Sequence, residues 1–237
     1  MREVVTAAVE AGAPAVLLRE KDLPPHDRHA LAVELAPTIA AAGAQLIVAS
    51  DAEVAADVGA DGVHLAATDP VPARAGSTAR AGSTARAGST RHDGRSSRPD
   101  DAVELPVGTL IGRSCHDEVE VRAAVDAQLD YVTVSPVAPT ASKPGYGPAL
   151  DVPGLAQLAA VAGDLPVLAL GGVGPDTVAR WCAAGAAGVA VLGAVMGARD
   201  PAAVVRALLE ELPPEPAPVP RGPWHPLTEA DPDTKAR

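Results

Sequence analysis

Phenylalanine is absent from this chain of 237 residues, and tryptophan and tyrosine occur only twice each. A hydrophobic core must therefore be built from aliphatic side chains, which supply nearly all of the 47% hydrophobic content. The length is sufficient for a full core, and α/β barrels of roughly 200 to 250 residues usually form one domain. Short aliphatic runs are typical of parallel strands that helices cover.

Cysteine is also scarce, since only Cys115 and Cys182 are present, and neither stands in a spacing typical of zinc ligands. We therefore expect no disulfide framework, and a reducing cytoplasm is the simplest location. The sequence lacks a basic leader before an apolar run and any apolar run of 18 residues, so we expect no signal peptide and no membrane span. The net charge of -11 argues against a nucleic-acid partner, so an anionic ligand needs a local cluster of cations.

Short apolar runs alternate with alanine-rich helical segments along the chain. The predicted strands are residues 15–19, 45–49, 62–65, 109–114, 131–135, 166–171 and 188–192. This alternation predicts βαβ units in an α/β, TIM-type (β/α)8 barrel from which the first strand is missing, because residues 2–11 already read as a helix. Either the protein starts upstream of Met1 or the barrel is open. We favour the first, because an open parallel edge leaves backbone groups unpaired.

Two segments have the composition of irregular chain. Residues 73–90 spell ARAGST three times and continue into an Arg/Gly/Ser-rich stretch, so we predict a disordered loop over about residues 72–101. Its arginines invite a nucleic-acid interpretation, but no aromatic side chains are interleaved for base stacking. We predict a barrel domain over residues 1–211 and a disordered proline-rich tail over residues 212–237.

Candidate site residues follow the strands, because barrel enzymes build their active sites at the carboxyl ends of strands. Arg19 and Lys21 stand two residues apart on a segment that we expect to be extended, so both cations point to one side and suit a phosphate or diphosphate. The alternative interpretation is that Arg19 and Lys21 belong to an exposed loop, where Glu20 and Asp22 balance their charges.

Two further loops have residues suited to phosphate. Thr140, Ser142 and Lys143 offer hydroxyls and an ammonium after the fifth predicted strand, although flexible loops use the same residue types. The glycines that end the last two predicted strands allow a phosphate to approach the backbone closely, and the loops after those strands commonly hold phosphate in barrels. These glycines are Gly171, Gly172 and Gly193.

The third and fourth predicted strands end in groups suited to proton transfer and metal binding. Asp69 is a candidate magnesium ligand, because Mg²⁺ typically takes one or two carboxylates together with substrate oxygens. Ser114 and His116 offer one phosphate donor and one proton-transfer group. His64 is a further histidine beside them, whereas Cys115 alternates to the other face and is expected to pack in the core.

Six motifs in this order resemble the strand-end motifs of the thiamine-phosphate synthase and thiazole tautomerase family. They are LLREKD, DGVHLAATD, IGRSCH, DYVTVSPVAPTASKPG, PVLALGGV and GVAVLGAV, and they cover nearly all of residues 10–205. By this resemblance, Arg19, Lys21 and Lys143 bind the diphosphate of an aminopyrimidine, Asp69 binds Mg²⁺, and Ser114 lies near the leaving group. The resemblance assigns the thiazole phosphate to Thr140, Ser142, Gly172, Leu192 and Gly193, and the reaction joins the two heterocycles with release of diphosphate.

Three positions depart from the synthase pattern on the pyrimidine side. Leu17 replaces a glutamine, Ala49 an asparagine, and Ser50 the second magnesium aspartate. Asp51 is the nearest carboxylate, but one residue along a strand its side chain points the other way.

Two alternatives to the synthase therefore stay open. A thiazole tautomerase uses His116 as acid and base and needs no metal, whereas a non-catalytic protein keeps only the thiazole-phosphate pocket. In each case the partner is a small phosphorylated heterocycle, with no nucleic acid and no membrane, and the resemblance is compatible with a homodimer.

Overall fold

The computed structural model describes residues 1–75, 103–140 and 147–213. Seven parallel strands form one curled sheet in the order β1-β2-β3-β6-β7-β8-β9. They are β1 (Ala15–Leu18), β2 (Gln45–Ala49), β3 (Gly62–Leu65), β6 (Leu110–Cys115), β7 (Tyr131–Val134), β8 (Val167–Leu170) and β9 (Gly188–Ala190). All seven predicted strands are confirmed, and their ends lie within two residues of the predicted ones.

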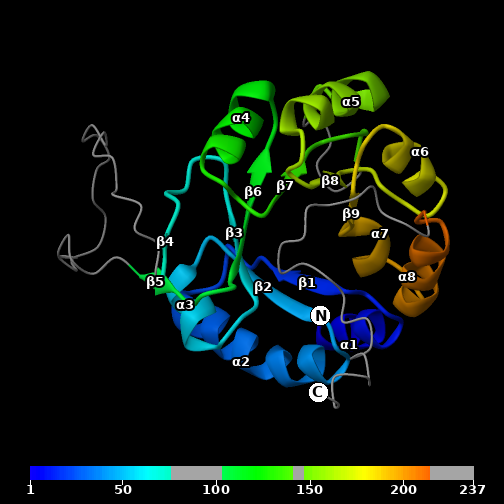
Figure 1. Ribbon diagram of the computed structural model, residues 1–237. Coiled ribbons are helices and arrows are strands. Elements are labelled where there is room, and N and C mark those ends of the chain that lie inside the picture. Colours follow the sequence, from blue (N-terminus) through cyan, green and yellow to red (C-terminus); the bar gives the residue numbers. More distant parts are fainter. Residues whose placement is uncertain (76–102, 141–146, 214–237) are drawn as a thin grey trace, which may run out of the picture.

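Helices form an outer layer around these strands (Figure 1). They are α1 (Arg2–Glu10), α2 (Pro25–Ala41), α3 (Ala52–Asp57), α4 (Glu118–Asp126), α5 (Asp151–Ala162), α6 (Val178–Ala183), α7 (Gly193–Met196) and α8 (Pro201–Glu210). An aspartate caps three of them, because the carboxylates of Asp51, Asp117 and Asp200 accept a backbone N–H three residues further on. Among the described helices, none is long and apolar enough to cross a membrane.

The alternation of the strands separates an aliphatic face from a polar one. Val63 and Leu65 of β3 join the buried cluster between sheet and helices, as do Ile111 and Cys115 of β6. Cys115 is fully buried there, as its alternation predicted. His64 and Ser114 alternate with these residues and point to the barrel interior, where they meet Thr133 and Tyr131 of β7.

The barrel is open between its first and last strands. Within the described residues, no strand pairs with the outer edge of β1 or of β9, so the sheet has seven strands, as predicted. Helix α1 closes the outer layer at this point, since it packs against both α8 and α2. Leu17 of β1 remains 38% exposed, although its register partner Ile47 is buried.

A second, two-stranded sheet corrects one boundary of the predicted irregular loop. β4 (Ala73–Arg74) pairs in parallel with β5 (Glu104–Leu105), so residues 73–74 are regular structure, although we expected the loop to begin at about residue 72. Arg74 also forms an ion pair with Asp130, whose carboxylate accepts the backbone N–H of Ile111 at 2.6 Å. These contacts tie the small sheet to β6 and β7. Residues 76–102 and 214–237 lie outside the described residues.

Candidate active site

Four polar side chains meet inside the barrel. His64 Nε2 lies 3.0 Å from Ser114 Oγ and 3.4 Å from Thr133 Oγ1, and His64 Nδ1 lies 3.1 Å from Tyr131 Oη. The parallel register brings them together, because it aligns Ser114 with Thr133 on the neighbouring strand. A Cβ at Gly112 would come within 2.1 Å of the Tyr131 ring, so glycine is needed for the ring to lie where it does.

His64 is held in its neutral form. Its side chain is 4% exposed, and burial lowers the pKa of the imidazole to about 4, with the positive charge of Arg19 acting in the same direction. The carboxylate of Asp69 opposes this shift without cancelling it. Arg19 is therefore close enough to the imidazole for its charge to act on the pKa of His64.

Asp69 is fixed on the loop that follows β3. Its Oδ2 accepts the N–H of Ala66 at 2.8 Å, and its backbone carbonyl accepts a hydrogen bond of 2.6 Å from Arg113 Nη2. Burial alone would raise the pKa of Asp69. The hydrogen bonds from Ser50 and Ala66, together with the charges of Lys21 and Arg113, outweigh it and lower the pKa. Asp69 is therefore an ionised carboxylate with a lysine nearby.

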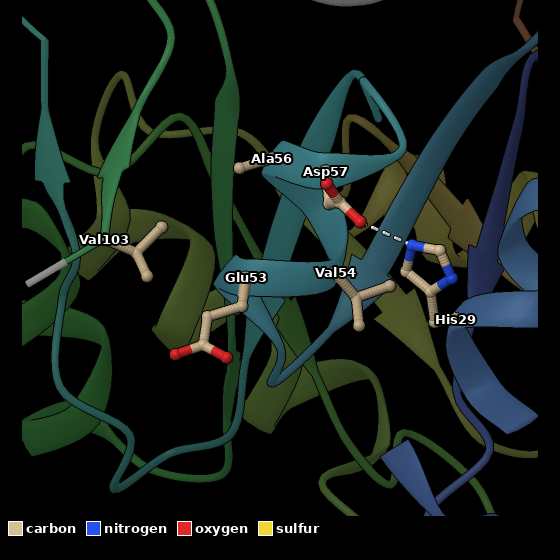
Figure 2. Close-up of a pocket in the computed structure, with 6 residues that line it drawn as sticks. All are labelled: His29, Glu53, Val54, Ala56, Asp57 and Val103. Carbon is tan, nitrogen blue, oxygen red and sulfur yellow. Dashed lines mark hydrogen bonds and ion pairs between the residues drawn. The ribbon is translucent and has the colours of Figure 1, made fainter. Parts of the chain in front are cut away.

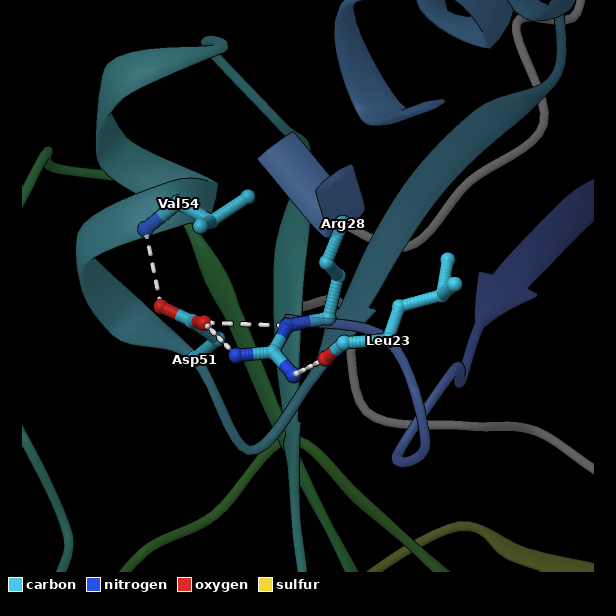
Figure 3. A network of polar contacts seen from close by, with 4 residues as sticks. All are labelled: Leu23, Arg28, Asp51 and Val54. Atoms are coloured by element: carbon cyan, nitrogen blue, oxygen red, sulfur yellow. Dashed lines mark hydrogen bonds and ion pairs between the residues drawn. The ribbon is translucent and has the colours of Figure 1, made fainter. Parts of the chain in front are cut away.

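Asp51 serves the fold rather than the polar interior (Figure 3). Its Oδ1 accepts the N–H of Val54 at 3.0 Å and caps α3. Its Oδ2 accepts from Arg28 Nε at 3.1 Å and from Arg28 Nη2 at 2.6 Å. Ser50, just before it, has a φ of 53°, which is unusual for a residue other than glycine, and its hydroxyl reaches Asp69.

These contacts decide how a magnesium ion can fit. Ser50 and Asp69 together offer one hydroxyl and one carboxylate, since both Asp51 oxygens are engaged. Within the described residues, no cluster of three or more His, Cys, Asp or Glu side chains is placed to hold a metal. Such a site fits Mg²⁺ only where substrate oxygens and water complete the coordination shell, as is common for this ion.

His116 lies on the loop after β6. Its Nδ1 is 2.7 Å from the carbonyl oxygen of Ser135, and because a carbonyl only accepts, Nδ1 carries the proton. The backbone N–H of His116 donates to Glu120 Oε2 at 2.6 Å. His116 therefore contacts the ends of both β6 and β7, and any proton that it transfers moves through Nε2.

The loops after β7 and β8 lie against each other. The N–H of Ala138 donates to the carbonyl of Gly171 at 3.1 Å, and a Cβ at Gly172 would lie 2.6 Å from the carbonyl oxygen of Pro139. Gly172 also has a φ of +67°, which glycine adopts at little cost. These contacts bring Gly171 and Gly172 beside the loop that leads to Thr140.

Other predicted phosphate residues follow the last strand. Leu192 is 62% exposed, and a Cβ at Gly193 would meet no atom within 4 Å. β9, which precedes them, pairs with β8, so both glycine sites follow neighbouring strands. Ser142 and Lys143 lie outside the described residues, so their place in the site stays a prediction.

Several predicted residues lie around the polar interior, and their roles in the reaction stay predictions. Arg19 acts on the pKa of His64 and Lys21 on the pKa of Asp69. The segment is not extended as we expected, because β1 ends at Leu18 and Lys21 begins a turn. Tyr131 and Arg113 were missed as site residues. The sequence could have indicated Tyr131 by its alternation with buried residues along β7. It could have indicated Arg113 as a charge within an apolar strand, and the structure buries this residue to 9% exposure.

A shallow depression on the outer surface contains none of the predicted site residues. Its lining consists of His29, Glu53, Val54, Ala56, Asp57 and Val103 (Figure 2). His29 Nε2 and Asp57 Oδ2 bridge α2 and α3 at 2.6 Å, and Asp57 is largely exposed. This depression lacks the glycine loops and cations that converge at the strand ends, so we do not assign the chemistry to it.

Comparison with known proteins points to one family. The family model described as thiamine monophosphate synthase matches residues 1–96 and 91–195. A thiamine-phosphate synthase of a Roseiflexus species is 34% identical over 210 residues, which are 88% of this chain and 77% of that protein. The thiamine biosynthesis bifunctional protein ThiM/ThiE of Symbiobacterium thermophilum is 38% identical over 89% of this chain, which spans 38% of its length.

A solved structure supports the fold. Thiamine phosphate pyrophosphorylase from Pyrococcus furiosus superposes with a TM-score of 0.65 over 89% of this chain and 88% of that one, at 24% identity. The seven-stranded curled sheet is thus a TIM-type fold.

Proposed function

The chain belongs to the thiamine monophosphate synthase family, and on this premise we propose that it joins an aminopyrimidine diphosphate to a thiazole phosphate. In this reaction, the bond from the pyrimidine methylene to the diphosphate oxygen breaks, and the electron pair leaves with diphosphate. The thiazole nitrogen then forms the new bond to carbon. The observation that supports the proposal is the contact between His64 and Ser114 inside the barrel, with Arg19 acting on the pKa of His64 and Lys21 on the pKa of Asp69.

The charge arrangement suits a diphosphate leaving group. Arg19 acts on His64, which contacts Ser114, and Lys21 acts on Asp69. Two cations and a hydroxyl can therefore approach the same anion, and they stabilise negative charge that grows as the bond breaks. We assign Lys143 to the same group by resemblance to the family.

Magnesium is part of the proposal on the same side of the site. Asp69 and the Ser50 hydroxyl would hold the ion, with the remaining positions filled by diphosphate oxygens and water. When bound, it supplies charge stabilisation to the departing diphosphate. Asp51 would take no part, because α3 and Arg28 use its oxygens.

We place the thiazole phosphate at the other side of the mouth. The close approach of Gly172 to the loop before Thr140 supports this assignment, as does the open space around Gly193. Glycine at both points lets the backbone approach a phosphate closely. Ser142 and Leu192 belong to the same proposed group.

The main test uses the purified full chain with both phosphorylated precursors and Mg²⁺. We expect thiamine phosphate and diphosphate in equal amounts. Ser114→Ala should lower kcat by about 100-fold, within the range for losing a donor to developing charge. Glu210→Gln on α8, outside the proposed site, is the control and should leave the rate unchanged.

The tautomerase alternative has its own support in the contact between His116 and Ser135. The same preparation is therefore given the thiazole carboxylate phosphate alone. Isomerisation that His116→Ala abolishes, without thiamine phosphate formation, would contradict the synthase proposal. Binding of the thiazole phosphate without either reaction would favour the non-catalytic protein. A homodimer and a cytoplasmic location stay predictions.

A further inference from the structure

We infer that His64 and Tyr131 are positioning residues that make Ser114 Oγ a hydrogen-bond acceptor on the barrel side, so that its O–H points to the bound anion. The inference rests on the proposed function for the identity of that anion. The contacts that carry it are His64 Nε2 to Ser114 Oγ at 3.0 Å and His64 Nδ1 to Tyr131 Oη at 3.1 Å.

The imidazole of His64 is neutral in the folded protein. His64 is 4% exposed, so a charged imidazole would be buried. Among the described residues its ring nitrogens contact neutral hydroxyls and no carboxylate, so the ring has one N–H and one lone pair at pH 7. The pKa of the Tyr131 hydroxyl is raised by burial and by Asp130, so this group keeps its proton. Three groups thus share a fixed number of protons, and two tautomers of His64 are possible.

The two tautomers of His64 differ in whether every proton has an acceptor. With the proton on Nε2, Tyr131 O–H donates to Nδ1 and Nε2–H donates to Ser114, so each proton has an acceptor. With the proton on Nδ1, Tyr131 has to accept it. Within the described residues Tyr131 then has no acceptor for its own proton. A phenol is also a better donor than acceptor, so the Nε2–H tautomer is favoured.

Thr133 supports the same choice. Its Oγ1 lies 3.4 Å from His64 Nε2, so a proton on Nε2 can be shared between Ser114 and Thr133. In the other tautomer, the hydroxyls of Ser114 and Thr133 would compete to donate to one lone pair. The arrangement of two hydroxyls around Nε2 therefore fits a donor at that nitrogen.

The hydroxyl of Ser114 has a single proton to donate. Ser114 is partly exposed, and His64 is its one polar partner among the described residues. Once Ser114 Oγ accepts from Nε2–H, its proton is directed to a group from outside the protein, which suits an anionic oxygen. With the opposite tautomer, Ser114 would donate inward and present lone pairs to an anion.

The first experiment measures the tautomer without any substrate. Uniformly ¹⁵N-histidine-labelled protein at pH 7 is examined by long-range ¹H–¹⁵N NMR, and the His64 signals are assigned from their loss in His64→Gln. We expect a protonated Nε2 and an unprotonated Nδ1. In Tyr131→Phe this preference should weaken, because the donor to Nδ1 is gone. A proton on Nδ1 in the unsubstituted protein would overturn the inference.

The second experiment measures the effect on Ser114. His64→Gln can keep an N–H near the Nε2 position, whereas His64→Met has similar length and no hydrogen-bonding N–H. We expect kcat for thiamine phosphate formation to be about tenfold lower in His64→Met than in His64→Gln, a factor that corresponds to one hydrogen bond of about 1.4 kcal/mol. KM for the thiazole phosphate should be equal in both, and circular dichroism checks that both fold.

The outcomes separate this inference from the proposed function. Equal kcat in both variants, with both folded, would overturn the positioning role. If the unsubstituted protein makes no thiamine phosphate, binding of inorganic diphosphate by calorimetry replaces the kinetic assay. Weaker binding in His64→Met than in His64→Gln supports the role of His64, and equal binding overturns it, whichever reaction the protein catalyses.

Discussion

Acid should destabilise this protein through His64 before its carboxylates are protonated. The pKa of His64 falls from 6.5 in a solvated chain to about 4 in the folded protein, because the imidazole is buried beside Arg19. The unfolded chain therefore binds a proton in the window between pH 6.5 and pH 4, while the folded protein does not. Stability is fully present above pH 6.5 and decreases as the pH falls through this window.

The size of the effect follows from the shift. Each pH unit within the window lowers the free energy of unfolding by about 1.4 kcal/mol. Relative to its value above pH 6.5, this free energy should be about 2 kcal/mol lower at pH 5 and about 3 kcal/mol lower at pH 4. Asp69 does not interfere, because its pKa is lowered as well, and its contribution disappears only as the pH falls through that lower value. Between pH 7 and pH 5 the slope should therefore come mainly from His64.

The assay is urea unfolding followed by circular dichroism at pH 7, 6 and 5. In His64→Gln, the free energy of unfolding should fall by about 2 kcal/mol less between pH 7 and pH 5 than in the unsubstituted protein, whatever the stability of the variant at pH 7. His26→Gln, whose side chain is 91% exposed, is the matched control and should keep the slope of the unsubstituted protein. Parallel loss of stability in the unsubstituted protein and His64→Gln would refute a buried neutral imidazole.

Three further changes test other contacts. Asp51→Ala removes the α3 cap and the partner of Arg28, and urea unfolding should show a loss of about 2 kcal/mol. Gly112→Ala places a methyl group against the Tyr131 ring and should cost about 1 to 3 kcal/mol in the same assay. Arg113→Met should change stability by less than about 1 kcal/mol, because the loss of the hydrogen bond to the Asp69 carbonyl is offset by removal of a buried Nε that has no partner within the described residues. It should still speed amide hydrogen exchange over residues 66–70.

Local pattern was sufficient to predict the strands. Each apolar run is short and bounded by polar or glycine residues, so the positions of β2 and β3 follow from composition alone. The alternation also predicted the burial of Cys115. Arg19 and Asp69 could be proposed from the sequence because strand ends in a parallel barrel converge on one face, which is a property of the fold and needs no knowledge of register.

Contacts between residues far apart in the chain could not be predicted from the sequence. His64 and Tyr131 are 67 positions apart, and their contact depends on the register of β3, β6 and β7 and on the room that Gly112 leaves. The turn at Lys21 was missed because charge spacing does not report backbone conformation. The pairing of β4 with β5 was missed because two residues are too few to show a period.

Asp51 is not available as a second carboxylate ligand for a metal ion, because α3 and Arg28 already bind its side chain. To serve a metal ion, Asp51 would have to leave both the α3 cap and Arg28, whose side chain is only 18% exposed. Losing the cap costs about 1 kcal/mol, and leaving a partly buried cation without its partner adds to this. A hydrated Mg²⁺ gives up water reluctantly and gains one ligand in return. The carboxylate therefore stays with Arg28, and the Mg²⁺ ion that we propose at Asp69 would depend on oxygens from the proposed diphosphate substrate.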